Sequence, residues 1–326
     1  MGLTSSKIPL TNLTTVVTGC DTGFGHETAL TLAATHKAIV YAGCLTATAV
    51  EAFERMKQDQ PHLYATLRPV QLDVTDWDAV QRFATVLERE CPEGVFCLLN
   101  NAGINMGSLF TWTTVEEFRK VMDVNLMGAM YMMKALIPLM RRYVIQNPTG
   151  HAPRIVNITS MAGRTVAPIL SAYCTSKWAL EALSDSVRQE LRPFGIRVAI
   201  IEPWFASTPL VVGNVEGEIK KIRDRFAVLA NRTDYGDPYL EAALATRHES
   251  PALTMKPVQV INVLIATIQA QEPKHRQIVG AIGRVIAFLY MLLPSRIMDP
   301  ISASSFGNVK PHGAVRNGRQ GLLSWL

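Results

Sequence analysis

Apolar runs rich in Val, Ile and Leu alternate with helix-period segments along most of the chain, and this alternation restricts the fold more than any other feature. Seven runs have the length of a strand, and they begin at Leu13, Ala38, Leu67, Val95, Arg154, Ile196 and Gln277. Helical patterns follow Gly25, Thr46, Thr75, Thr114, Ala172 and Lys256. Continuously apolar strands joined through helices are typical of a parallel sheet that is covered on both faces. The sequence therefore predicts one doubly wound α/β domain with a seven-stranded parallel sheet and helices on both faces.

Domain boundaries are expected where this alternation stops. We predict an N-terminal arm over residues 1–12, one domain over 13–301, and a flexible basic tail over 302–326. A polar segment over 209–251 interrupts the alternation after the sixth strand. In a doubly wound fold, an insertion at this point covers the carboxyl ends of the strands, where ligands bind. A surface excursion without such a role is the alternative.

An apolar segment over 278–294 is the second interruption. It is shorter than the roughly 20 residues of a membrane-spanning helix, and it contains Arg284. We therefore expect either a buried helix or a helix that lies on a membrane surface.

Composition excludes several classes of protein. Hydrophobic residues make up 48% of the chain and charged residues 18%, which excludes disordered and collagen-like chains. The 5 cysteines are odd in number and scattered, which predicts free thiols in a cytosol-facing compartment rather than a secreted disulfide framework. None of the 7 histidines forms a pair with metal-ligand spacing, so we predict no metal site.

The first predicted strand leads directly into the sequence TGCDTGFG, with glycines at Gly19, Gly23 and Gly25 and a helical pattern behind them. Glycines permit a tight turn and close approach of the backbone, and the N-terminus of the next helix favours a phosphate. Because the loop has this strand–turn–helix context, the sequence predicts a Rossmann-type dinucleotide site that includes Phe24.

The choice between the two nicotinamide dinucleotides follows from charge. A 2′-phosphate needs an Arg or Lys in the glycine loop or near the end of the second strand. The loop instead carries Asp21, and the second strand ends at Cys44, which we place at the cofactor, without a basic residue. NAD(H) is therefore favoured over NADP(H). The strand-end Asp that usually binds the ribose hydroxyls is also absent, which weakens the preference.

Other polar residues stand at predicted strand ends. Asp73 closes the third strand and is placed to reach the adenine edge, with a helix N-cap as the alternative. The fourth strand ends in NNAG, and we expect Asn101, Ala102 and Gly103 to line the cofactor. Asn125 lies within a helical pattern, where Asn has low propensity unless its side chain has a partner. A functional hydrogen bond is favoured there over a tolerated surface amide.

Ser160, Tyr173 and Lys177 form the strongest combination of residues. Tyr173 and Lys177 are four positions apart, which places both on one face of a helix. An ammonium near a phenol favours the phenolate and lowers the phenol pKa towards neutrality, which makes Tyr173 a usable general acid/base. Ser160 lies at a strand end, from which it can hydrogen bond a carbonyl or alkoxide oxygen.

These motifs resemble those of the short-chain dehydrogenase/reductase family over about Leu13 to Pro294. The glycine loop, NNAG, the helix Asn, the Ser and YxxxK all match in order and spacing. TGCDTGFG, CLT after the second strand, IEP and the late LLP resemble a narrower branch, the retinol, hydroxysteroid and D-β-hydroxybutyrate dehydrogenases.

The resemblance implies roles for these residues. Tyr173 would be the acid/base, Lys177 would also bind the nicotinamide ribose, and Ser160 would stabilise the reacting oxygen. Asn125 would hold a water linked to Lys177. The family usually forms dimers or tetramers through the helices around Asn125 and Tyr173, so a homodimer or homotetramer is expected.

One position departs from the family pattern. The family Pro-Gly after the sixth strand reads Pro203-Trp204 here, whereas Thr208 matches the later family Thr. Pro203 and Thr208 are expected at the cofactor. Trp204 either turns away with a shifted backbone or narrows the pocket.

The preferred function is interconversion of a hydrophobic retinoid, steroid or other lipid-like alcohol and its carbonyl, with the apolar stretch Val285–Leu293 lining the pocket. A D-β-hydroxybutyrate-type dehydrogenase is the first alternative, and it needs a cation for the substrate carboxylate, for which Lys220, Lys221 and Arg223 are available. The second alternative is a dinucleotide-binding sensor or scaffold that does not catalyse.

The net charge of +5 lies entirely in the last part of the chain. Residues 272–326 hold 7 basic and 2 acidic side chains, whereas the preceding chain is balanced. The tail lacks interleaved aromatic residues, so no nucleic-acid partner is predicted. The start MGLTSS fits the pattern for N-myristoylation at Gly2, and we expect no signal peptide because no apolar segment stands before the first predicted strand. We expect a cytoplasmic protein or a peripheral one on a cytosol-facing membrane, held by the acyl chain, the 278–294 segment and the basic charge.

Overall fold

The computed structural model of the chain describes residues 7–208 and 254–303, with positions 210, 217, 220, 223, 224 and 241 between these ranges. Residues 1–6, most of the predicted insertion over 209–251 and the tail from residue 304 lie outside the described part, and so does Gly2.

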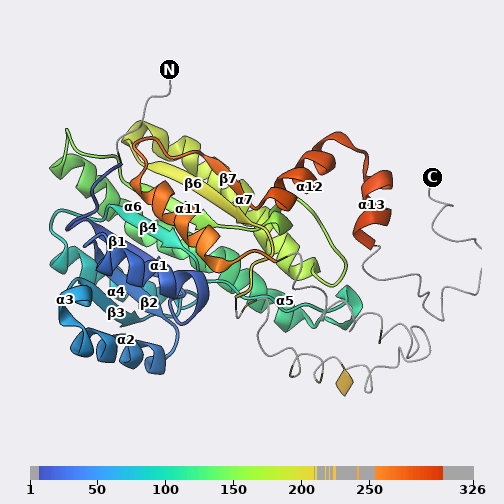
Figure 1. Cartoon of the computed structure of the whole chain (residues 1–326), viewed down its shortest axis with the longest axis horizontal. Helices are drawn as coiled ribbons and strands as arrows, with labels where there is room; N and C mark the ends of the chain where they lie inside the picture. The colour runs from blue at the N-terminus through green and yellow to red at the C-terminus, as the bar shows by residue number, and fades with distance from the viewer. Residues whose placement is uncertain are drawn as a thin grey trace, which may run out of the picture.

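The seven strands form one sheet in the order β3-β2-β1-β4-β5-β6-β7, and every neighbouring pair is parallel. This confirms the predicted fold class (Figure 1). Because each connection must cross over the sheet, parallel strands need helices on its faces. The strands are β1 (Thr14–Thr18), β2 (Ile39–Cys44), β3 (Leu67–Gln71), β4 (Cys97–Asn100), β5 (Arg154–Ile158), β6 (Arg197–Pro203) and β7 (Arg276–Val279).

Two apolar cores lie on the two faces of the sheet. Consecutive strand residues point to opposite faces, so Val17 belongs to one core and Val16 to the other. The first core is covered by α1 (Gly23–Ala34), α2 (Ala47–Asp59) and α11 (Pro257–Gln269). The second is covered by α4 (Trp77–Glu90), α6 (Ala129–Gln146) and α7 (Ser171–Leu191). The short α3 (Pro61–Tyr64) follows α2, and α5 (Val115–Met122) packs on α7.

Helix starts follow the sequence signals closely. Thr46 caps α2 by accepting a hydrogen bond from the Ala49 N–H, and Thr114 caps α5 in a reciprocal capping box with Glu117. Asp76 caps α4, so the alternative that Asp73 is this cap was wrong.

Residues 7–12, part of the predicted N-terminal arm, pack against the domain. Ile8 and Leu10 are fully buried in the first core, and the Ile8 N–H donates to the Gln269 carbonyl at 2.7 Å. The start of the described chain is thereby joined to the end of α11.

The apolar 278–294 segment divides between two elements. Ile278 and Val279 end β7, and most of the remainder forms α12 (Ala281–Leu292), followed by α13 (Ser295–Ala303). Only Gly283 of α12 is buried, so the expectation of a buried helix was wrong. Its exposed side chains include Ile282, Val285, Phe288, Met291 and Leu292. All five cysteines are free, as predicted, and the structure shows that all five are buried.

Candidate active site

A cavity of about 940 Å³ opens at the carboxyl ends of the strands. Its wall includes residues that directly follow β1, β2, β3, β4, β5 and β6. The sheet order reverses between β1 and β4, and in open α/β sheets ligands bind at such a switch point.

The glycine loop after β1 has the geometry of a phosphate cradle. Gly19 and Gly23 have φ angles of +67° and +66°, which side-chain-bearing residues rarely adopt. A Cβ on Gly25 would lie 2.4 Å from the Asn101 amide nitrogen and 2.4 Å from the Gly19 carbonyl oxygen. Gly19, Gly23 and Phe24 line the cavity, whereas Gly25 is buried beneath the loop.

The first turn of α1 leaves room for an anion. Its N-cap Thr22 makes no side-chain capping hydrogen bond, and no acidic residue lies in the first turn. The backbone N–H groups at this end therefore have neither a side-chain acceptor nor a competing carboxylate, and the positive end of the helix dipole favours a phosphate there. Together with the glycine geometry, this fits the pyrophosphate of a dinucleotide.

Asp21 joins the glycine loop to the end of β2. Its carboxylate accepts hydrogen bonds from the Leu45 N–H at 2.8 Å, the Thr46 N–H at 3.0 Å and the Thr46 hydroxyl at 2.7 Å. A negative charge therefore occupies the N-terminus of α2, beside the cavity. This is the side of the loop where a 2′-phosphate would need a cation.

Of two other residues predicted at the cofactor, Asp73 lies at the cavity and Cys44 does not. Asp73 lines the cavity, with its carboxylate accepting from the Thr75 N–H at 2.9 Å. The Cys44 side chain is fully buried in the first core, and Leu45 and Thr46 line the cavity in its place. Burial raises the pKa of the Cys44 thiol to about 12.

The NNAG turn ties β4 to β1. The Asn101 amide donates to the carbonyls of Thr18 and Gly19 at 2.8 and 2.9 Å. In return, the Thr18 hydroxyl accepts from the N–H groups of Asn101 and Ala102. Sequence reasoning missed Thr18, although its place at the end of the first strand was visible. Ala102 and Gly103 line the cavity beyond this clamp.

Asn125 lies in a π-helical turn, η2 (Asp123–Gly128), between α5 and α6. Its carboxamide oxygen accepts from the Ile104 N–H at 2.8 Å, and its nitrogen donates to the Ile104 carbonyl and the Ser176 hydroxyl at 2.9 Å. These hydrogen bonds are the partners that an Asn in a helical pattern requires. The side chain is buried, which excludes the alternative of a tolerated amide on the surface. A Cβ on Gly103 would lie 3.4 Å from the Asn125 oxygen and 3.6 Å from Lys177 Nζ, which places both atoms beside the same backbone turn.

Ser160, Tyr173 and Lys177 line one part of the cavity. Ser160 follows β5 and hydrogen bonds the Tyr173 side chain, while its own oxygen accepts from the Ala162 N–H. Lys177 Nζ lies 5.6 Å from the Tyr173 ring centroid and donates to the Ile158 carbonyl at 3.0 Å. The arrangement brings a phenol, an alcohol and an ammonium group together at the strand ends.

The pKa of Tyr173 differs from the sequence prediction. Burial raises it to about 12, and the hydrogen bond with Ser160 lowers it by less. Burial also lowers the pKa of Lys177 to about 8, against the opposing effect of Glu181. Desolvation therefore outweighs the Ser160 hydrogen bond at Tyr173 and the Glu181 charge at Lys177, since Lys177 is buried and Tyr173 partly buried.

The far wall of the cavity is largely apolar. It includes Trp204, Phe205, Ile286, Tyr290 and Met298. Trp204 therefore contributes to the wall, and its ring packs edge-to-face on Phe205 with centroids 5.1 Å apart. A Cβ on Gly280 would lie only 3.0 Å from the Trp204 Cβ, so this glycine makes room for the Trp. The Tyr290 hydroxyl donates to the Val166 carbonyl at 3.2 Å and joins α12 to the segment after β5.

Pro203 and Thr208, the remaining residues predicted at the cofactor, also line the cavity, and Thr208 is buried.

A comparison with models of protein families matches residues 13–218 to the family described as "short chain dehydrogenase". The chain belongs to this family. Short-chain dehydrogenases are oxidoreductases that bind a nicotinamide dinucleotide and act on small molecules.

Similar proteins place this short-chain dehydrogenase in the predicted branch. Retinol dehydrogenase 5 of Mus musculus is 34% identical over 302 residues, which cover 90% of this chain and 89% of the relative. Mitochondrial D-beta-hydroxybutyrate dehydrogenase of Bos taurus is 34% identical over 74% of this chain and 69% of its own. A short-chain dehydrogenase structure from Streptomyces avermitilis, 23% identical, aligns with a TM-score of 0.67 over 90% of this chain and 97% of its own. It shares the fold.

Proposed function

We propose that this short-chain dehydrogenase is an NAD(H)-dependent oxidoreductase that interconverts a hydrophobic, lipid-like alcohol and its carbonyl. The observation that carries the proposal is that one cavity joins the glycine loop, the Ser160–Tyr173–Lys177 group and an apolar wall. The similarity to retinol dehydrogenase 5 supports a retinoid or another lipid-like alcohol as substrate.

The dinucleotide supplies the hydride acceptor or donor at the carbon that carries the oxygen. Tyr173 takes the hydroxyl proton during oxidation and returns it during reduction. Ser160, which hydrogen bonds Tyr173, is placed to hold the same substrate oxygen. Lys177 contributes an ammonium charge beneath the Tyr173 ring, and Asn125 holds the backbone turn at Gly103 beside it.

The raised pKa of Tyr173 favours its reductive role. With a pKa of about 12, Tyr173 carries its proton at neutral pH and is ready to donate it to an alkoxide. Oxidation first requires loss of this proton, which added positive charge near the phenol would assist.

Asp21 supports the choice of NAD(H). Its carboxylate occupies the α2 N-terminus, where a 2′-phosphate would otherwise gain hydrogen bonds and a favourable dipole. A like-charged phosphate beside it is repelled, whereas a ribose hydroxyl is accepted as a donor.

The decisive experiment replaces Tyr173 by Phe. The variant should lose turnover of retinol and steroid alcohols while binding NADH, followed by nicotinamide fluorescence, with unchanged affinity. Tyr290→Phe is the matched control, since it removes the same hydroxyl from the same cavity wall without removing the proposed acid/base. Retained turnover in Tyr173→Phe refutes the assignment, and NADH binding without turnover in the wild type favours the sensor alternative.

A D-β-hydroxybutyrate-type activity is the second candidate, favoured by the 34% identity to that dehydrogenase. A substrate carboxylate needs a cation, and Lys120 lines the cavity. Of the cations predicted for this role, Lys221 lies outside the described residues, and Arg223 is ion-paired with Glu241 at 2.8 Å. Comparing D-β-hydroxybutyrate with retinol and steroid alcohols in one assay distinguishes the two candidates.

Peripheral attachment to a cytosol-facing membrane is also part of the proposal. Within the described residues, no helix has the length and apolar character needed to cross a membrane. The apolar side chains on α12, with Arg284 and Arg296 close by, support contact with an anionic surface. Binding to anionic vesicles should weaken in Phe288→Glu and in Gly2→Ala, and unchanged binding in both would contradict the proposal.

A homodimer or homotetramer is proposed through the helices around Asn125 and Tyr173. Trp178 on α7 is about half exposed, which is unusual for so large an aromatic side chain and supports a covered position in an assembly. Light scattering of the wild type and Trp178→Glu tests this: a monomeric wild type would contradict it.

A further inference from the structure

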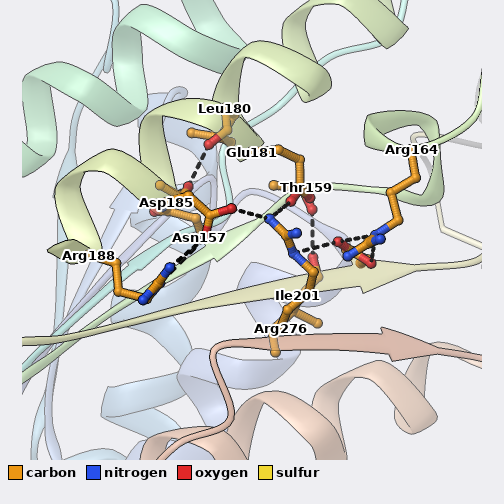
Figure 2. Close-up of polar contacts among 11 residues, drawn as sticks. Asn157, Thr159, Arg164, Leu180, Glu181, Asp185, Arg188, Ile201 and Arg276 are labelled. Atoms are coloured by element: carbon orange, nitrogen blue, oxygen red, sulfur yellow. Dashed lines mark hydrogen bonds and ion pairs between the residues drawn. The ribbon is translucent and has the colours of Figure 1, made fainter. Parts of the chain in front are cut away.

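A network of charged side chains, two of them buried carboxylates, lies beside the proposed active site and takes no part in the chemistry described so far. Figure 2 shows it between α7, β6 and β7. Its members are Arg164, Glu181, Asp185, Arg188, Glu202 and Arg276, with Arg188 paired to Asp185 at 3.3 Å. The Glu202 side chain is fully buried and that of Glu181 is only 9% exposed. Buried carboxylates are costly unless they are paired, so the network calls for a physical explanation.

Arg276 of β7 is the centre of the network. Its guanidinium lies 2.6 Å from a Glu181 oxygen and 2.8 Å from an Asp185 oxygen, both on α7. Its Nε atom lies 3.1 Å from Glu202 on β6. Arg164, from the segment after Ser160, donates to both Glu202 oxygens at 2.7 and 2.8 Å. The network therefore ties the segment after Ser160 to α7, β6 and β7.

Glu181 is the member closest to the proposed chemistry. It lies one helical turn after Lys177 on α7, so both side chains are on the same face of the helix. It also hydrogen bonds the side chain of Thr159, the residue before Ser160. A Cβ on Gly163 would lie 2.9 Å from the Glu181 Cγ and 3.2 Å from the Lys177 carbonyl oxygen, so the Ser160 segment packs directly on this turn.

The charges around Glu181 and Lys177 act on each other. Burial is the main cause that lowers the Lys177 pKa to about 8, and Glu181 opposes it. Burial and the nearby Glu202 raise the pKa of Glu181 to about 7, whereas Arg276 lowers it. The charged groups that face Glu181 from the surrounding elements are Lys177 and Asp185 on α7, Glu202 on β6, Arg276 on β7 and, through Glu202, Arg164.

We propose that Glu181 is a positioning residue for the dehydrogenase reaction. Held by Arg276 and packed on the Ser160 segment, it fixes the end of β5, where the Ile158 carbonyl accepts from the Lys177 ammonium, and so keeps Lys177 in place beneath Tyr173. This inference rests on the proposed function, in which the Lys177 ammonium beneath the Tyr173 ring is needed for the reaction. Arg276 acts through Glu181, since its guanidinium lies 2.6 Å from this carboxylate and fixes its position.

The test compares Glu181→Gln with Asp185→Asn in the full-length protein. Both variants remove one carboxylate from Arg276 with almost no change in shape, but only Glu181 influences Lys177. The readout is the Lys177 pKa, measured by NMR titration of ¹³Cε-labelled lysines and assigned with Lys177→Arg. We expect the Lys177 pKa to fall by about one unit in Glu181→Gln and to stay unchanged in Asp185→Asn. The alkaline limb of the pH profile of kcat/KM should move to lower pH by the same amount.

Two outcomes overturn the inference: an unchanged Lys177 pKa in Glu181→Gln, or equal shifts in both variants, which would indicate a purely structural network. If Glu181→Gln does not fold, Glu181→Asp replaces it, because the shorter side chain keeps the charge next to Arg276 but withdraws it from the Ser160 segment, and it should also lower the Lys177 pKa. An unchanged value there refutes the proposal equally. The NMR readout needs no turnover, so failure of the proposed function, seen in Tyr173→Phe, is distinguishable from failure of this inference.

Discussion

Replacing Gly25 by Ala probes the contact that holds the dinucleotide loop against the NNAG turn. The added methyl group would lie 2.4 Å from the Asn101 amide nitrogen and 2.4 Å from the Gly19 carbonyl oxygen. Neither atom is free to move, because the Asn101 amide donates to the carbonyls of Thr18 and Gly19. The methyl group must therefore displace the clamp or shift the loop.

Opposing effects set the change in the free energy of unfolding of Gly25→Ala. Ala in a helix is favoured over Gly by about 1 kcal/mol. Overpacking costs about 1–3 kcal/mol, and loss of the two Asn101 hydrogen bonds costs about 1 kcal/mol each. We therefore expect the free energy of unfolding to fall by about 3 kcal/mol, with a decrease in Tm of about 6 °C.

Thermal unfolding of the ligand-free protein measures this, with NADH affinity by nicotinamide fluorescence as the second readout. Gly103→Ala is the control, since its methyl group would meet the nearest atoms, Asn125 Oδ1 and Lys177 Nζ, at 3.4 and 3.6 Å, close to ordinary contact. Its Tm should stay within about 2 °C of the wild type. A double-mutant cycle with Asn101→Ala separates the clash with the Asn101 amide from the clash with the Gly19 carbonyl, because the amide is absent in the double variant.

The reasoning fails if Gly25→Ala unfolds at the wild-type temperature and binds NADH normally. Strict additivity of Gly25→Ala and Asn101→Ala would show that the Gly19 carbonyl, and not the Asn101 amide, opposes the methyl group.

Three further predictions concern charge and shape. Asp21→Asn should raise the kcat/KM ratio of NADP to NAD roughly tenfold, because a carboxylate next to the expected 2′-phosphate position is removed; an unchanged ratio in steady-state assays would contradict the role of Asp21. Trp204→Ala should raise kcat/KM for bulky steroid alcohols relative to retinol by roughly tenfold, since a large side chain leaves the substrate wall; equal effects on both substrates would show that Trp204 does not select. The pKa of Glu181 is raised from 4.5 to about 7 on folding, so its contribution to stability is fully present below about pH 4.5 and is lost as pH rises through 7. Urea unfolding at pH 5 and pH 8 should therefore show wild-type stability falling relative to Glu181→Gln as pH rises, and a constant difference would refute this.

The fold could be predicted because its signals are local. Each strand is a short apolar run, and residues such as Thr46 and Thr114 mark helix starts through their own capping bonds. Whether α12 is buried could not be predicted, because an apolar sequence does not show whether the core, a cavity or solvent surrounds it. Here Ile286 and Tyr290 line the cavity, whereas Val285 and Phe288 are exposed.

The positions of the site residues were predictable from strand ends, but their environments were not. Cys44 ends β2 and still points into the core, because side-chain direction alternates along a strand. The pKa of Tyr173 was expected to fall because only the Lys177 charge was visible in the sequence, and burial reverses the direction. Glu202 lies in an apolar run of the sequence, but nothing there indicates its partner Arg276, which comes from a strand many residues later.

The bond between Ile8 and the Gln269 carbonyl sets an order of events during synthesis. The N-terminal segment leaves the ribosome first, whereas its partner at the end of α11 appears only after all but one strand of the sheet has been made. At about 5–20 residues per second, Ile8 and Leu10 wait tens of seconds before the core that buries them is complete. During that time they are apolar residues in water, within reach of chaperones or of other nascent chains. A chain that stops before Gln269 lacks the carbonyl that accepts from the Ile8 N–H.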